Sequence, residues 1–134
     1  MRQCGFTLVE LAVTLMVLAI VTAIAMPTFS SMSQAARLTG LVNSMVAGLN
    51  LARSEAIKRN QRVVVCKSGD AGACSLSGGW HQGWIVFADT NNNATRDAGE
   101  ELIAMQNADS AEMQLTGNSP VSRYVSFTPV GVPK

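Results

Sequence analysis

Glu10 is the only ionisable side chain in an apolar run of twenty-one residues, 6–26. A helix of this length extends about 30 Å, which is the thickness of the hydrocarbon core of a bilayer. A carboxylate in such a run costs about 2.5 kcal/mol or more at the bilayer centre and less near an end. Glu10 is therefore a candidate functional residue that needs a partner.

Two cysteines, Cys66 and Cys74, close a ring of nine residues. In an oxidising compartment they are expected to form a disulfide, which would stabilise a small domain by about 2.5 kcal/mol through chain closure. A metal site is the alternative, although His81 is the sole histidine of the chain. Because His81 has no acid or nucleophile at a spacing typical of a catalytic site, we predict that the protein is not an enzyme.

The segment 89–100 is a third candidate, because its oxygen-bearing residues have the spacing of a calcium-binding loop. Ala94 stands where such a loop favours glycine, and Arg96 adds a cation. We favour the alternative interpretation, a solvated β-hairpin tip with Asx turns, and therefore expect no cofactor, with calcium as the alternative. The possible ligands are Asp89, Asn91, Asn93, Thr95, Asp97 and Glu100.

A long helix and a small sheet are expected to position these residues. Pro27 removes one helical hydrogen bond and is expected to bend the helix without ending it. Apolar residues then recur every three or four positions up to about residue 60, which predicts an amphipathic helix with one covered face. They are Leu38, Leu41, Val42, Met45, Val46, Leu49, Ala52, Ala56 and Ile57.

The remainder of the chain has the pattern of a sheet. Apolar and β-branched runs predict strands at residues 62–67, 83–88 and 101–105, and two shorter strands at 112–116 and 121–128 around a turn. The expected fold class is α+β, in which a long N-terminal helix, membrane-spanning in its first half, packs on a small antiparallel β-sheet. A chain of 134 residues with net charge +1 leaves room for one small head and does not favour a polyanionic partner.

The N-terminus, Met-Arg-Gln-Cys-Gly before Phe-Thr-Leu-Val-Glu, resembles the leader and first helix of the type IV pilin superfamily. The resemblance implies that a prepilin peptidase cuts between Gly5 and Phe6, that Phe6 is then N-methylated, and that Cys4 is lost with the leader. Glu10 would lie about one helical turn from the Phe6 amine, where the positive helix end favours an anion. The amine of a neighbouring subunit could also neutralise Glu10 and set the axial register.

Residues 51–62, the strand with Cys66, residues 83–87 and the acidic segment up to Glu101 are similar to the GspH/FimT branch of this superfamily. The similarity covers about residues 5–104. It implies a low-copy, non-enzymatic minor pilin near the tip of a type IV pilus, or alternatively a minor pseudopilin of a type II secretion system. Relatives usually continue through further strands after the Phe-Thr-Pro segment, so the sheet is expected to be smaller here or to lack its last strands.

The resemblance also implies partners and a location. The partners are other pilins or pseudopilins and the prepilin peptidase. Before assembly the chain would cross the inner membrane once, with its head in the periplasm, and it would then enter a pilus or pseudopilus. The implied organisation is a leader at 1–5, a membrane-spanning and filament-core helix at 6–26, an amphipathic continuation at 27–60 and a β-sheet head at 61–134.

Some FimT-type pilins are implicated in DNA uptake through basic residues, which adds a hypothesis for the cations of this chain. Phosphate binding requires clustered Lys and Arg. The competing interpretation is that cations at a helix end interact with the helix dipole and with solvent. The candidates are Lys58, Arg59, Arg62 and Lys67 at the predicted helix end, and Arg123 and Lys134 near the C-terminus.

A rival hypothesis comes from a different functional class. Residues Ala23, Ile24 and Ala25 also satisfy the small-x-small rule for cleavage of a secretory signal peptide. Cleavage there would release a secreted module that begins at Met26 and binds calcium or another ligand.

Overall fold

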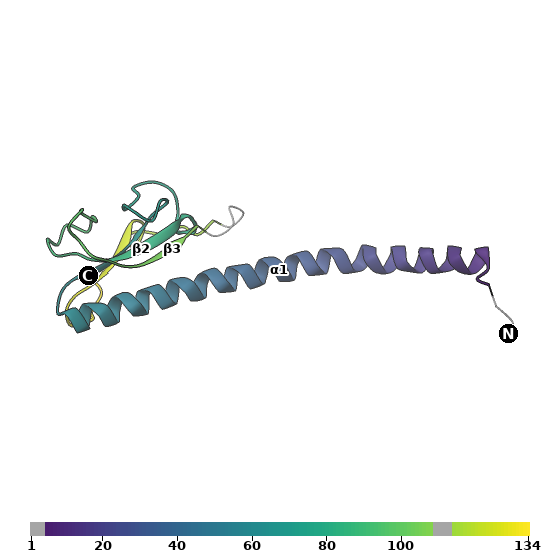
Figure 1. Ribbon diagram of the computed structural model, residues 1–134, viewed down its shortest axis with the longest axis horizontal. Helices are drawn as coiled ribbons and strands as arrows, with labels where there is room; N and C mark the ends of the chain where they lie inside the picture. Colours follow the sequence, from purple (N-terminus) through teal and green to yellow (C-terminus); the bar gives the residue numbers. More distant parts are fainter. Residues whose placement is uncertain (1–4, 109–113) are drawn as a thin grey trace. The chain divides into compact units, whose positions relative to one another are not determined.

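The computed structural model describes residues 5–108 and 114–134, and of residues 26–28 it describes the backbone alone. Its elements are α1 (Leu8–Arg59), β1 (Val63–Lys67), the short 3-10 helix η1 (Trp80–Gln82), β2 (Gly83–Ala88), β3 (Leu102–Asn107) and β4 (Tyr124–Phe127), as Figure 1 shows. The chain divides into two compact units, Met1–Thr39 and Gly40–Lys134. The predicted α+β class is confirmed.

Helix α1 continues through Pro27, as predicted, and ends at Arg59. Asn60 follows in the left-handed conformation, with φ of 52°. The N–H of Gln61 then donates to the carbonyl of Ala56 at 3.3 Å, and the N–H of Asn60 donates to that of Ile57 at 3.3 Å. These two bonds form a Schellman motif, which satisfies carbonyls at the end of the helix and turns the chain toward β1.

The four strands form one antiparallel sheet in the order β3-β2-β1-β4. In the register of the central strands, Val65 of β1 lies opposite Val86 of β2 and Val125 of β4. The residues after β4 fold back along its outer edge, where Pro133 forms a bridge with Phe127. The three strands predicted at 62–67, 83–88 and 101–105 are therefore present, with ends that differ by at most two residues.

The prediction of a strand at 112–116 is wrong for residues 114–116, which belong to no strand, whereas 112 and 113 lie outside the described residues. The backbone of Leu115 bonds to η1 instead. Its carbonyl accepts the N–H of Trp80 at 2.7 Å, and its N–H donates to Nδ1 of His81 at 3.2 Å. Because both groups are satisfied in this way, this residue needs no neighbouring strand.

The last strand is shorter than the predicted 121–128, because β4 starts only at Tyr124. The carbonyl of Val121 accepts the indole N–H of Trp80 at 3.1 Å, and residues 121–122 form a turn. β4 pairs with β1 at the edge of the sheet opposite β3, and within the described residues no strand pairs with β4 across the 117–120 turn.

Within the unit Gly40–Lys134, the last turns of α1 pack on one face of the sheet. An added Cβ at Gly48 would lie 2.9 Å from Nε1 of Trp84, so a glycine at this position lets the indole approach the helix closely. Burial of these apolar side chains is the main stabilising contribution of this layer. The core comprises Leu41, Ala52, Ala56, Val63, Val65, Trp80, Trp84, Val86 and Phe127, with Met45 and Leu49 packed against it.

The predicted apolar face of the helix was too wide. Leu38, Val42, Val46 and Ile57 are exposed, although each belongs to the repeating pattern. The sheet is only four strands wide and contacts the helix along a single narrow row, so neighbouring apolar positions remain uncovered in this chain.

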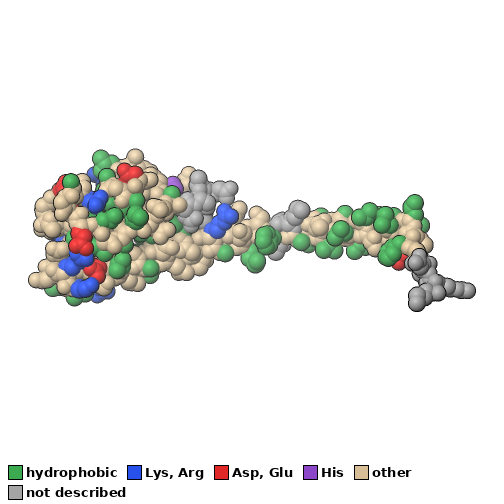
Figure 2. Space-filling model, in the orientation of Figure 1, with side chains coloured by type: hydrophobic (Ala, Val, Ile, Leu, Met, Phe, Trp, Pro, Cys, Tyr) green, Lys and Arg blue, Asp and Glu red, His purple; other side chains and the backbone are tan. Residues whose placement is uncertain are grey.

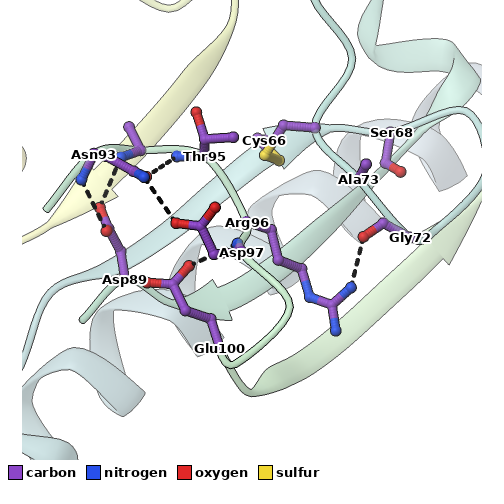
Figure 3. The surroundings of a disulfide bond; sticks show 12 residues. Cys66, Ser68, Gly72, Ala73, Asp89, Asn93, Thr95, Arg96, Asp97 and Glu100 are labelled. Carbon is purple, nitrogen blue, oxygen red and sulfur yellow. Dashed lines mark hydrogen bonds between the residues drawn. A yellow bond between two sulfur atoms is a disulfide. The ribbon is translucent and has the colours of Figure 1, made fainter. Parts of the chain in front are cut away.

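Two loops cover the opposite face of the sheet: the cysteine loop, residues 68–79, and the acidic loop, residues 89–101. Val64, Cys66, Ile85 and Phe87 are buried there. Residues Ala71 and Cys74 of the first loop and Ala94 of the second pack against this cluster. The fold therefore brings the cysteine loop and the acidic loop to the same face of the sheet, and Figure 3 shows them beside each other.

Candidate functional site

The start of α1 carries the candidate carboxylate. Glu10 lies in the first turn, and its N–H donates to the Thr7 hydroxyl at 3.2 Å. The carbonyl of Thr7 accepts the N–H of Leu11 at 3.1 Å. Thr7 is thus the N-cap residue of a helix that begins directly after Gly5 and Phe6. The Thr-x-x-Glu spacing of a capping box is the sequence signal for this cap.

The N-terminal part of α1 presents a run of exposed apolar side chains. One eighteen-residue window has a mean hydropathy of 2.5 and is 0% buried. Figure 2 shows the green hydrophobic side chains along this part of the helix. An apolar core helix would be buried, so this helix has instead the length and composition to cross a membrane.

The predicted disulfide between Cys66 and Cys74 is confirmed, with an Sγ–Sγ distance of 2.05 Å. Both thiols are used in this bond, which leaves neither for the alternative metal site. Within the loop that the disulfide closes, Oδ1 of Asp70 accepts the N–H groups of Gly72 at 2.9 Å and Ala73 at 3.1 Å. These hydrogen bonds, that from Gly72 above all, lower the pKa of Asp70.

Asp89, the first residue of the acidic loop, is buried in an ion pair. Its Oδ2 lies 3.0 Å from Nη1 of Arg62 and accepts the N–H of Ala94 at 3.0 Å, while Oδ1 accepts the N–H of Asn93 at 3.1 Å. Ala94 has a φ of 59°, so it makes the left-handed turn for which glycine would be favoured. Figure 3 shows the Asp89 carboxylate below Asn93.

The other oxygen-bearing side chains of the loop bind loop N–H and amide groups. Asp97 accepts from Nδ2 of Asn91 at 2.6 Å and of Asn93 at 2.8 Å. Glu100 accepts from the N–H of Thr90 at 2.8 Å and of Asp97 at 3.1 Å. Hydrogen bonds among its own residues therefore hold this loop in its turn conformation. Within 5–108 and 114–134, no group of three or more His, Cys, Asp or Glu could hold a metal ion, and calcium binding stays a prediction.

Arg62 connects three segments of the head. Its side chain is 8% exposed, and besides Asp89 the guanidinium donates to the carbonyl of Asn92 at 2.9 Å and to the hydroxyl of Ser126 at 3.0 Å. Its Cζ lies 5.8 Å from the centre of the Tyr124 ring. Arg62 is therefore a buried structural residue and offers no exposed charge to a phosphate.

The remaining cations of the proposed DNA-binding set differ in exposure. Lys67 is 4% exposed, and its Nζ donates to the carbonyl of Gly78 at 2.8 Å. Lys58, Arg123 and Lys134 are exposed. The structure therefore leaves only part of the set at the surface, and DNA binding stays a prediction.

Arg59 holds the end of α1 to the start of β3. Its Nε lies 2.6 Å from Glu55, and its Nη1 lies 2.6 Å from Glu101. Figure 2 shows basic and acidic side chains next to one another on the head. The bond from Arg59 lowers the pKa of Glu55, with a further contribution from Lys58, and it lowers the pKa of Glu101. The two carboxylates, Glu101 first, raise the pKa of Arg59.

Two protein-family models match the chain. The model described as type II transport protein GspH matches residues 41–134, which include the whole sheet and the disulfide. The model described as the prokaryotic N-terminal methylation motif matches residues 1–26, which include Gly5, Phe6 and Glu10. No curated protein and no solved structure matches the chain.

Proposed function

The chain belongs to the GspH family of type II transport proteins, and from this premise we propose that it is a minor pilin of a type IV pilus. As a pilin or pseudopilin it assembles with other pilins and is processed by a prepilin peptidase. The proposal adds that it is a low-copy, non-enzymatic subunit near the filament tip.

One observation carries the proposal. The apolar window of α1 is 0% buried, and it belongs to a segment that matches a methylation motif. Such a surface must be removed from water, first by lipid and then by the helices of neighbouring subunits. We propose that the chain crosses the inner membrane once before assembly, with its head in the oxidising periplasm, where the Cys66–Cys74 disulfide persists.

Residues 51–62 are similar to the GspH/FimT branch, whose members include subunits of both kinds of filament, and of the two we propose the type IV pilus. The alternative is a minor pseudopilin of a type II secretion system, the function that the description of the matched family names. Deletion of the gene in its host distinguishes the two. We expect loss of surface pili with protein secretion unchanged, whereas normal pili with impaired secretion would favour the pseudopilin.

Glu10 provides the direct test of assembly. A buried carboxylate in a bundle of apolar helices needs a positive partner, for which we propose the Phe6 amine of a neighbouring subunit. We expect Glu10→Leu to leave membrane insertion and the head intact but to reduce incorporation into filaments strongly. Incorporation is measured by immunoblotting of sheared filaments against the membrane fraction.

The matched control is Thr14→Val, one turn along the same exposed helix. Thr14 donates only to the carbonyl of Leu11, at 2.8 Å. This variant should assemble as the unchanged chain does. Normal incorporation of the Glu10→Leu subunit would remove the role that we propose for the carboxylate.

A further inference from the structure

A cavity of about 300 Å³ lies against the sheet face that α1 does not cover. The cysteine loop, the acidic loop and the start of β4 each contribute part of its lining. We call it the disulfide pocket. The lining residues that matter for its chemistry are Cys66, Cys74, Leu76, Thr95, Arg123 and Tyr124.

Three polar groups of the disulfide pocket that can donate hydrogen bonds have no partner among the described residues. Within the described residues, the Arg123 guanidinium forms no ion pair or side-chain hydrogen bond, and the hydroxyls of Thr95 and Tyr124 form none. The lining contains no Asp or Glu. A lining that contains one guanidinium and two hydroxyl groups is complementary to an anionic group.

The rest of the lining includes apolar groups. The Cys66–Cys74 disulfide and the Tyr124 ring line the pocket, together with Leu76, which is 77% exposed. Its volume is at the lower end of the range for sites that bind small molecules or single side chains. A ligand that fills it would therefore combine one negative charge with an apolar group.

The number of available cations indicates which class of anion the pocket can bind. Among the cations near these loops, Arg62 is bound to Asp89, and Arg96 donates to the carbonyl of Gly72 at 2.6 Å. Arg123 alone remains for a ligand in the lining. One cation matches one carboxylate, whereas a nucleic-acid backbone requires several clustered cations.

We propose that the disulfide pocket binds the C-terminal carboxylate of a partner protein whose last residue is apolar or aromatic. Arg123 would bind the carboxylate, the hydroxyls of Thr95 and Tyr124 would donate to it, and Leu76 with the disulfide would contact the apolar part. The proposal does not depend on which filament the chain enters.

The test is a titration of the mature, ¹⁵N-labelled chain in dodecyl maltoside micelles, followed by NMR. The probe is N-acetylphenylalanine, and N-acetylphenylalanine amide is its neutral control. We expect saturable shift changes at Thr95, Arg123 and Tyr124 with the acid. Because the amide lacks the charge-assisted hydrogen bonds, it should bind about tenfold more weakly or worse.

Two matched variants complete the experiment. Arg123→Gln should weaken binding of the acid about tenfold or more, whereas Arg53→Gln, an exposed arginine on α1, should not change it. The absence of saturable shifts, equal binding of acid and amide, or unchanged binding by Arg123→Gln would overturn the proposal. Tighter binding of a ten-nucleotide oligothymidine through the same residues would overturn it in favour of a phosphate ligand.

Discussion

At the scale of single residues, we expect substitution of Asp89 to lower the stability of the head. It is buried and faces the buried guanidinium of Arg62. Asp89→Asn would remove the charge and leave Arg62 without its counter-charge, which costs about 3–5 kcal/mol when one partner of a buried pair is lost. We expect the free energy of unfolding to fall by an amount in this range, as measured by urea denaturation of the mature chain in detergent.

Asp97→Asn is the control, because it makes the same chemical change in the same loop at an exposed position. Asp97 accepts only from the amides of Asn91 and Asn93, so its loss should cost about 1 kcal/mol or less. Equal costs for the two variants would contradict the buried ion pair. Repeating the measurements in millimolar calcium tests the metal hypothesis, because a bound ion would raise the stability of the unchanged chain.

At the scale of elements, Arg59 joins the end of α1 to the start of β3 through Glu55 and Glu101. Both carboxylates have a pKa below the ordinary value of 4.5, chiefly because of the hydrogen bond from Arg59. A lowered folded-state pKa stabilises the fold above the unfolded-state value, and this contribution is lost as the pH falls through the folded-state value. We therefore expect the unfolding free energy to decrease as the pH is lowered below about 4.5.

Arg59→Gln should make this acid dependence shallower, whereas Lys58→Gln should change it little because Lys58 bonds only to Glu55 and is largely exposed. Asp70, whose pKa is also lowered, contributes to the acid dependence of both variants and cancels in their comparison. Equilibrium denaturation at several pH values between 3 and 7, roughly spanning the carboxyl titration, provides the measurement. Identical pH profiles for the two variants would show that Arg59 does not couple the helix to the sheet.

At the scale of the whole molecule, the position of cleavage decides whether the apolar N-terminal part of α1, residues 8–25, stays in the mature protein. The methylation motif covers residues 1–26, so we expect a mature chain that begins with N-methylated Phe6. Intact-mass spectrometry and N-terminal sequencing of the protein from host membranes give the answer directly. A mature chain that begins at Met26 would instead mean that the apolar helix is a signal peptide and that the head is secreted.

Local sequence patterns were sufficient to predict part of the fold. Hydropathy identified the apolar helix with Glu10, and the β-branched runs located β1 and β2. The short ring between Cys66 and Cys74 predicted their bond. The narrower packed face of α1 could not be predicted in this way, because it depends on the width of the sheet and on the close approach of Trp84 at Gly48.

Length, hydropathy and short-range spacing thus determined that this chain has a membrane-capable helix and a small disulfide-linked sheet, since these properties depend on neighbours in the sequence. Tertiary structure alone decided that Arg62 and Asp89, which the sequence offered only as candidates for DNA binding and calcium binding respectively, are paired with each other, and that Lys67 is buried. It also placed Arg123 beside the disulfide. The physical reason is that the partner and exposure of a charged side chain depend on which distant segments the fold brings together.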